Sequence, residues 1–236
     1  MALFLRLLLG HILGDFAFQP GRLVRAKRTG FQGQALHAAI VTACTAAALV
    51  GDLDAAWPAV LAAGLAHLAI ERVSVPARNT AAHSGLLVFF LDQGLHVLSL
   101  VLIALILPAP VEPGVLGVEM SIAQLALLDA VVTAALMGSI VAFEARTATR
   151  AAGDGAIPVL RFDLARAYGM AERSVALLVG VLSPFPAAGL AVFVPRVVYA
   201  IAAPPEPRSR HLSEAAAGAA LCTVLWFLVV ALSWRA

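Results

Sequence analysis

The stretch Gly85-Leu-Leu-Val-Phe-Phe-Leu-Asp-Gln-Gly-Leu-His-Val-Leu-Ser-Leu-Val-Leu-Ile-Ala-Leu-Ile-Leu107 is long and apolar enough to cross a bilayer, which takes roughly 20 mostly apolar residues. It nevertheless contains Asp92 and His96, which stand four residues apart. Residues four apart share one face of a helix, and ionisable side chains inside a membrane span are costly and usually functional. The stretch therefore predicts a transmembrane helix that carries part of a polar site.

The same pairing recurs in two other apolar stretches, as His11-Ile-Leu-Gly-Asp15 and His67-Leu-Ala-Ile-Glu71. In these two the histidine comes first, whereas Asp92 precedes His96. If the helix with Asp92 crosses the membrane in the opposite direction to the other two, the three histidines and the three carboxylates lie at matching depths. The sequence thus predicts one polar layer built from several helices.

Composition places the chain in the membrane class. Hydrophobic residues make up 61% of its 236 residues and charged residues only 13%, with a mean hydropathy of +0.93, whereas globular domains have about a quarter charged residues. The net charge is only +2, and the basic residues lie in loops, so nucleic acid is not an expected partner. The fold class that follows is all-α, a polytopic transmembrane helix bundle that forms a single domain over 1–236.

Seven segments qualify as candidate spans by length and hydropathy. They are 2–19, 34–51, 55–73, 85–107, 121–143, 172–200 and 213–234. The first four contain the polar layer, so we expect a four-helix histidine and carboxylate core over 1–107. Segment 145–171 is too polar to span and is expected to be a cytoplasmic connecting segment.

The loop charges predict the orientation. The connecting segments 20–33, 72–84 and 144–173 each carry at least two basic residues, whereas 51–54 and 108–120 contain no Lys or Arg. Because cytoplasmic loops carry an excess of Lys and Arg, the N-terminus is expected outside.

The sixth candidate span, 172–200, is interrupted by Ser183-Pro-Phe-Pro186. A single kinked span gives about seven spans in all but leaves Arg208 and Arg210 outside, against the charge rule. A re-entrant pair would return these arginines to the cytoplasm. We adopt the single kinked span as the expectation.

Nitrogen and oxygen donors of the kind that bind zinc, iron or manganese are concentrated in the polar layer. With a fourth histidine from the second span, the expected metal ligands are His11, Asp15, His37, His67, Glu71, Asp92 and His96. Helix bundles build dinuclear sites from such inward-facing pairs, so one or two divalent ions, zinc or iron, are expected, with surplus donors orienting the ligands. The alternative is a hydrogen-bonded polar core without metal.

Three neighbouring side chains are candidate catalytic residues. Gln19 and Gln93 could hold a substrate oxygen or could instead satisfy a carboxylate, and Glu71 could act as a general base if it is not a ligand. Asp129, in the fifth span, is expected to form a structural hydrogen bond with a nearby Ser or Thr. Glu172, Arg173 and Glu214 are expected to form ion pairs at the membrane interface.

These motifs resemble a bacterial multi-spanning membrane family known only as domain of unknown function 3307. The likeness lies in His-x-x-Gly-Asp-Phe-x-x-Gln over 11–19, Leu36-His37, the third-span pair and Phe-x-x-Asp-Gln-x-x-His over 89–96. It covers about residues 1–107, with a weaker likeness at Gly169-Met-Ala-Glu-Arg173. Glu71 stands where the family usually has aspartate, and Pro195-Arg196 where it has Lys-Ser. The resemblance implies a multi-pass protein of the bacterial inner membrane.

Three functions are compatible with these motifs. The first is a metal-dependent membrane enzyme, a hydrolase or group transferase that acts on a lipid-borne or amphipathic substrate near the cytoplasmic face, with di-iron lipid oxidation as a variant. Membrane lipid would be its other partner. The second is a transporter of metal ions or protons, in which the histidines and carboxylates form a relay. The third is a metal-free membrane scaffold.

Overall fold

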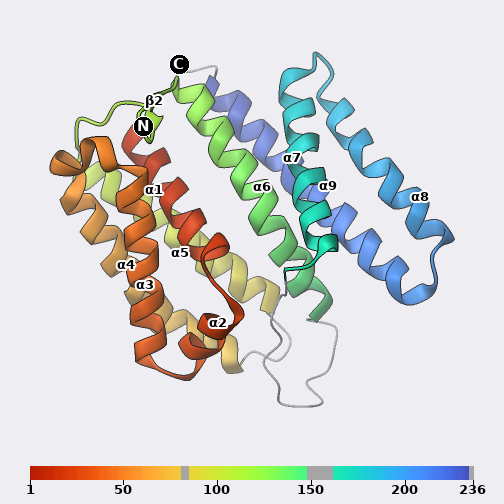
Figure 1. The fold of residues 1–236 in the computed structure, drawn as a ribbon, viewed down its shortest axis with the longest axis horizontal. Helices are drawn as coiled ribbons and strands as arrows, with labels where there is room; N and C mark the ends of the chain where they lie inside the picture. Colours follow the sequence, from red (N-terminus) through yellow and green to blue (C-terminus); the bar gives the residue numbers. More distant parts are fainter. Residues whose placement is uncertain (81–84, 148–161, 234–236) are drawn as a thin grey trace. The chain divides into compact units, whose positions relative to one another are not determined.

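The computed structural model describes residues 1–80, 85–147 and 162–233, and these are helical almost throughout (Figure 1). The expected all-α class is confirmed, with one small hairpin of β1 (Gly114–Val115) and β2 (Val118–Glu119). The chain divides into two compact units, so the single domain expected over 1–236 has an internal division. Of the described residues, 1–125 belong to the first unit and 126–147 and 162–233 to the second.

The first unit is a bundle of helices that lie side by side in Figure 1. Its elements in chain order are α1 (Ala2–Ile12), the π-helical turn η1 (Leu13–Ala17), α2 (Gly21–Thr29), α3 (Phe31–Ala48), the 3-10 turn η2 (Val50–Asp52), α4 (Leu53–Thr80) and α5 (Gly85–Ile106). The short helix α2 is bent by 95° from the helix formed by α1 and η1. It therefore turns across one end of the bundle.

Four described helices are long and apolar enough to cross a membrane, or five if the bent pair counts as one span. The four segments are Val50–Pro76, Leu86–Ile106, Ile122–Glu144 and Arg208–Leu232. This is fewer than the expected seven. Gln32, Gln34 and His37 lower the hydropathy of α3, and three charged residues interrupt the helix that begins at Leu164.

Helix α5 is built inside out relative to a water-soluble helix. Its buried face includes Asp92, Gln93 and His96, whereas large apolar side chains such as Leu95 and Leu105 are exposed. In water this arrangement would expose hydrophobic surface and bury polar groups. In a bilayer the exposed face contacts lipid, and the inward face can carry a polar site.

An apolar layer fills the half of the first-unit bundle that lies away from α2. Its buried members come from four helices and include Leu7 of α1, Leu49 after α3, Ala59 of α4 and Leu100 of α5. Beyond this layer, the buried guanidinium of Arg6 donates to the carbonyl oxygen of Ala48 at 2.8 Å. Arg6 also pairs with Asp52 and donates to the carbonyl oxygen of Glu112 at 3.0 Å, which ties the two loops at this end together.

The segment formed by α1 and η1 approaches α3 closely because two glycines, Gly10 of α1 and Gly14 of η1, lie at the contact. A Cβ atom on Gly10 would stand 2.3 Å from Cα of Thr45, and one on Gly14 would stand 2.6 Å from Cα of Val41. Gly10 and Gly14 are four residues apart, the small-residue spacing that allows transmembrane helices to pack with their backbones close. This close approach brings the polar ends of α1 and α3 together.

The second unit consists of most of α6 (Ile122–Thr147) together with α7 (Leu164–Leu182), η3 (Pro186–Phe193), α8 (Val194–Ala202) and α9 (Pro205–Ser233). Asp163 caps the start of α7 by accepting from the backbone N–H of Arg166 at 2.8 Å. This backbone hydrogen bond holds the pKa of Asp163 below its usual value. The expected connecting segment 145–171 overlaps both helices, and its residues 148–161 lie outside the described part.

The expectation of a single kinked span over 172–200 is wrong. Helix α7 ends at Leu182, and after a turn η3 packs back against it, where Gly189 lies so close that a Cβ atom would stand 2.3 Å from the carbonyl oxygen of Ala176. The prolines therefore end α7, since proline cannot continue a helix interior without losing a hydrogen bond. The segment is a helical hairpin.

We expect alanine at Gly10 or Gly14 to force α1 away from α3. Overpacking of this kind costs about 1–3 kcal/mol, so thermal unfolding in detergent should shift to a lower temperature. Gly94→Ala is the matched control, because nothing lies within 4 Å of a Cβ atom there. An equal loss of stability in all three variants would contradict the close-approach role.

Candidate metal centre

All seven predicted ligands gather at the α2 end of the first unit. Each is at most 8% exposed. They come from four helices of the bundle and the η1 turn: His11 from α1, Asp15 from η1, His37 from α3, His67 and Glu71 from α4, and Asp92 and His96 from α5. The structure therefore brings together every residue that the sequence proposed as a metal ligand.

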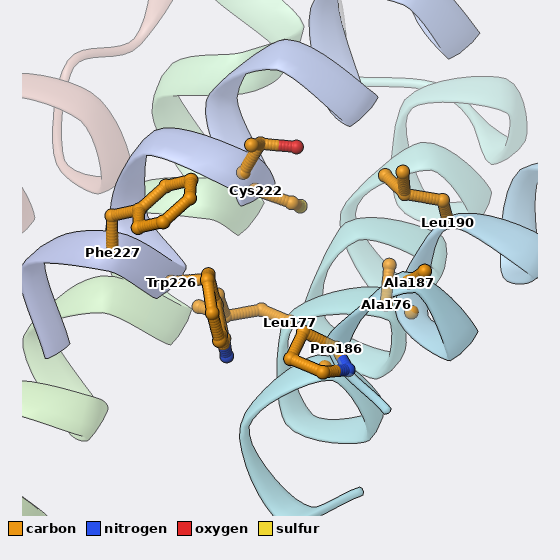
Figure 2. A pocket seen from close by; sticks show the side chains of 11 residues that line it. Ala176, Leu177, Pro186, Ala187, Leu190, Cys222, Trp226 and Phe227 are labelled. Carbon is orange, nitrogen blue, oxygen red and sulfur yellow. The ribbon is translucent and has the colours of Figure 1, made fainter. Parts of the chain in front are cut away.

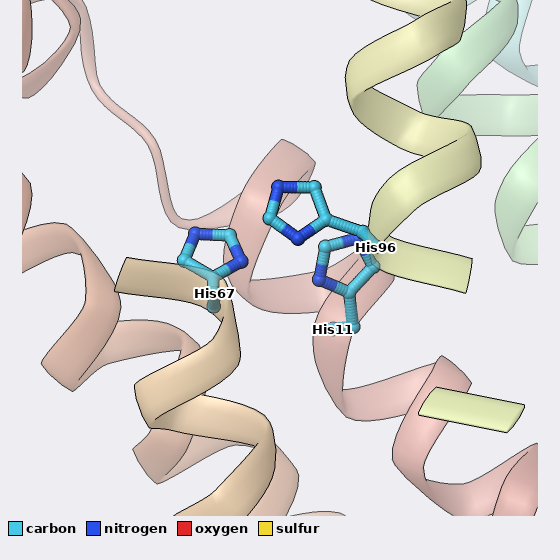
Figure 3. A group of neighbouring side chains, drawn as sticks. All are labelled: His11, His67 and His96. Atoms are coloured by element: carbon cyan, nitrogen blue, oxygen red, sulfur yellow. The ribbon is translucent and has the colours of Figure 1, made fainter. Parts of the chain in front are cut away.

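Three of the histidines face one another (Figure 3). The ring centroids of His67 and His96 are 4.3 Å apart in a stacked arrangement, and those of His11 lie 4.8 Å from His96 and 5.4 Å from His67. One ring nitrogen from each of the three can be chosen so that all lie within 4.8 Å of one another. We call His11, His67 and His96 the histidine triad.

Several nitrogens of the histidine triad have no hydrogen-bond partner among the described residues. They are Nε2 of His11 and both ring nitrogens of His67. Buried polar atoms in proteins are nearly always satisfied by a protein group, ordered water or an ion. Imidazole nitrogens that face a shared space with no protein partner are therefore suited to bind a metal ion.

The triad offers a set of donors that could hold a divalent metal ion. Zinc–nitrogen bonds of about 2.0–2.1 Å in tetrahedral geometry place ligand atoms about 3.4 Å apart. The triad nitrogens lie within 4.8 Å of one another, so binding would require them to move closer and the stacked rings of His67 and His96 to turn until their in-plane lone pairs converge. Three histidines also leave the fourth tetrahedral position open, the arrangement found in catalytic rather than structural zinc sites. Iron accepts the same imidazole donors.

Asp15 is the hub of the surrounding hydrogen-bond network. Its Oδ1 lies 3.0 Å from Nε2 of His37, and its Oδ2 accepts a hydrogen bond from the Gln93 amide at 3.0 Å. The η1 turn that carries Asp15 is π-helical, a local widening that is frequent at functional sites. Both carboxylate oxygens of Asp15 are thus occupied by protein groups.

Lys27 is a member of the cluster that sequence reasoning missed. Its buried ammonium donates to Oε1 of Glu71 at 2.8 Å and lies 4.0 Å from Oδ1 of Asp15. By sequence this lysine was expected only as part of a basic cytoplasmic loop. The sequence feature that could have indicated its burial is the four-residue spacing of Leu23 and Lys27, which places both on one face of α2. These two are the buried residues of that helix.

The two glutamines contact carboxylates. Gln93 donates to Asp92 at 3.1 Å as well as to Asp15, and the amide nitrogen of Gln19 lies 3.4 Å from Asp15 Oδ1 and 3.1 Å from Nε2 of His37. The two roles considered for these glutamines were to hold a substrate oxygen or to satisfy a carboxylate. Their contacts in the structure correspond to the second role. Glu71 keeps one oxygen, Oε2, without a hydrogen-bond partner among the described residues.

The second unit has its own buried charges, arranged as ion pairs. Arg196 donates to Glu172 at 2.6 Å, and Arg173 donates to Glu214 at 3.2 Å and to the Ala134 carbonyl at 2.8 Å. The ion pairing expected for Glu172, Arg173 and Glu214 is present, although all four partners of these pairs are buried.

The expectation for Asp129 is wrong. The hydroxyl of Thr133 donates to the backbone carbonyl of Asp129 and not to its carboxylate. Both carboxylate oxygens are buried without a hydrogen-bond partner in the described part of the chain.

A cavity of about 200 Å³ in the second unit lies between α7, η3 and α9. Figure 2 shows that side chains such as Leu177, Leu190 and Trp226 line it. The lining contains no carboxylate, imidazole or basic group. It therefore offers none of the chemistry found in the histidine and carboxylate cluster.

Asp15→Asn should destabilise the first unit, because it removes the negative charge that His37, Gln93 and Lys27 surround. Removing one partner of a buried charged network costs about 3 kcal/mol, which thermal unfolding in detergent would detect. Asp54→Asn, at an exposed position of α4, should leave the unfolding temperature unchanged. Equal stability of the two variants would contradict the central role of Asp15.

Comparison with protein families gave one relevant result. A family model with the description "Protein of unknown function (DUF3307)" matches residues 3–113. This range contains all seven predicted ligands, both glutamines and Lys27. No curated protein and no solved structure matches the chain. Residues 3–113, which make up less than half of the chain, are therefore similar to this family.

Proposed function

We propose that the first unit binds a divalent zinc or iron ion at the histidine triad and that the protein is a metal-dependent membrane enzyme. Its reaction is hydrolysis or group transfer on a lipid-borne or amphipathic substrate. The observation that carries this proposal is that three buried imidazoles meet while Nε2 of His11 and both ring nitrogens of His67 have no hydrogen-bond partner among the described residues. A metal-free scaffold gives no reason for three imidazoles to meet in this way.

The charge of the cluster supports a divalent cation. With its groups ionised, Asp15, Glu71 and Asp92 contribute −3 and Lys27 contributes +1, which leaves −2 among the buried groups around neutral imidazoles. An uncompensated charge in a low-dielectric interior costs several kcal/mol. One divalent ion brings the sum to zero.

The residues around the triad can divide the remaining tasks. A bound metal ion would polarise a phosphoryl or acyl oxygen and activate water near neutral pH. Glu71 can accept a proton through Oε2, because Lys27 already occupies Oε1. Gln93 and Gln19 fix the position of Asp15, and His37 lies between Asp15 and Glu71, 3.0 Å and 3.6 Å from their nearer oxygens.

The apolar layer of the first unit favours an enzyme over a transporter. The buried side chains of Leu7, Leu49, Ala59 and Leu100 lie between the polar cluster and the Arg6–Asp52 pair at the other end. A transport path needs polar groups or water through this half of the bundle. The buried residues of the layer named here carry no ionisable group, so the site is expected to open toward one membrane face.

The loop charges support a cytoplasmic position for that face, in a bacterial inner membrane. Helix α2 carries Arg22, Arg25, Lys27 and Arg28 and lies at the cluster's end of the bundle, whereas the Arg6–Asp52 end has loops without Lys or Arg. With α2 on the cytoplasmic side, the N-terminus lies outside. A substrate with an apolar tail and a polar head would then meet the site just below the cytoplasmic interface.

The hairpin of the second unit supports a different span count from the seven expected. Arg210 lies 3.4 Å from Asp163, so the start of α9 and the start of α7 are at one end of that unit. The chain therefore runs away from this end of the unit along α7 and comes back to it along α8. Arg208 and Arg210 then lie on the same side of the membrane as the start of α7. We propose that α1, α3, α4, α5, α6 and α9 cross the membrane.

Metal content is the direct test of the proposed centre. Protein purified in detergent without chelators should contain zinc or iron by elemental analysis, and His67→Ala or His96→Ala should lose most of it. Gln93→Ala should retain metal, because the amide positions a carboxylate and is not a ligand. Because imidazole must be deprotonated to bind, the metal content of the wild type should fall as the pH drops below about 6.

His211→Ala is a suitable control, because His211 belongs to the second unit and lies 3.5 Å from Arg196. It should keep the wild-type metal content. Folded wild-type protein that holds no metal at neutral pH would overturn the proposed function and leave the metal-free scaffold as the better account.

The orientation can be tested with single cysteines in a background that lacks Cys44 and Cys222. A membrane-impermeant thiol reagent added from outside should label Asp54→Cys but neither Arg25→Cys nor Arg210→Cys. Opening the membrane should then expose both protected positions. Labelling of position 25 from outside would contradict the orientation, and opposite behaviour of positions 25 and 210 would contradict the paired course of α7 and α8.

A further inference from the structure

We propose that the ammonium of Lys27 occupies the position of a second cation in the cluster, so that the centre holds one metal ion and not two. This inference rests on the proposed metal centre and specifies how many ions it takes. Lys27 would then be the residue that determines the stoichiometry of the site.

The cluster contains a second set of donors beside the triad. Ligand atoms of Asp15, His37 and His67 can all lie within 4.8 Å of one another, and Oε1 of Glu71 is 3.6 Å from Nε2 of His37. Oxygen and imidazole donors of this kind suit zinc, iron or manganese. His67 has two nitrogens without partners among the described residues and belongs to both sets. By donors alone the cluster could therefore hold two ions.

Lys27 places a positive charge among the carboxylates of this second set. Its Nζ is 2.8 Å from Glu71 and 4.0 Å from Asp15. One divalent ion at the triad together with Lys27 balances the three carboxylates. A second divalent ion would leave the buried cluster at +2 while Lys27 remains charged, and it would have to take Glu71 from the ammonium.

The fold holds Lys27 in place through its backbone. Gln34 donates to the Lys27 carbonyl oxygen at 3.1 Å, and Arg72 in turn donates to the Gln34 amide oxygen at 3.1 Å. Gly33 allows close packing here, because a Cβ atom at that position would stand 2.4 Å from the backbone nitrogen of Lys27. A flexible surface lysine would extend to water, whereas this one is fixed so that it points into the bundle.

The test is a count of metal ions in variants of the full-length protein. Wild type and variants are saturated with Zn²⁺, dialysed and analysed for zinc per chain. We expect one equivalent in the wild type and two in Lys27→Met. Arg22→Met, which removes an exposed charge from the same helix, should keep one equivalent, and so should Lys27→Arg, which retains the cation.

Lys27→Gln is a second variant for the case in which Lys27→Met does not fold. Its amide can still donate a hydrogen bond to Glu71, but it carries no charge. It should also bind two equivalents. One equivalent in a folded Lys27→Gln variant would overturn the role of Lys27 and leave the metal centre intact. Two equivalents in the wild type would do the same, whereas no zinc in a folded wild type would overturn the proposed function itself.

Discussion

Charge that is buried inside a membrane bundle must be compensated locally, and this constraint determines how the first unit is built. Asp15, Glu71 and Asp92 lie where neither water nor counterions screen them well. Lys27 of α2 and the Gln93 amide donate hydrogen bonds to these carboxylates, and the imidazole of His37 lies within hydrogen-bonding distance of Asp15. Helix α2 turns by 95° across the end of the bundle, which allows a residue from a polar helix to reach the buried carboxylates.

The same constraint explains why the packing of α1 against α3 is so close. The donors sit on separate helices, and side chains of limited length can meet only if the backbones approach. Gly10 directly precedes His11 and Gly14 directly precedes Asp15 in the chain, so the contact that draws this segment toward α3 also positions two of the seven predicted donors. The close packing of this segment against α3 and the placement of its two predicted donors therefore depend on the same contact.

Much of the site could be predicted from the sequence because its signals are local. An i, i+4 pair of histidine and carboxylate inside an apolar run is costly in a membrane helix and seldom occurs there without a role, and all seven predicted donors do lie together. Lys27 was missed because its role depends on the turn into α2, a tertiary feature that composition does not show. The hairpin of α7 and η3 was missed for a related reason: the pattern Ser183-Pro-Phe-Pro186 shows that a helix is interrupted, but only packing shows that the chain then returns.

The two units differ in how their buried charged groups are arranged. In the second unit the buried carboxyl group of Asp129 has no hydrogen-bond partner among the described residues, but the other buried charges are balanced, because Arg173 and Arg196 pair with Glu214 and Glu172. Such pairs hold helices in register and need no further ion. In the first unit the carboxylates of the cluster outnumber its lysine, and three imidazoles face one another, two of which, His11 and His67, have nitrogens without a partner among the described residues. A cluster whose function was only to join helices would have no use for this surplus of donors and negative charge, whereas the metal ion that we propose would account for both.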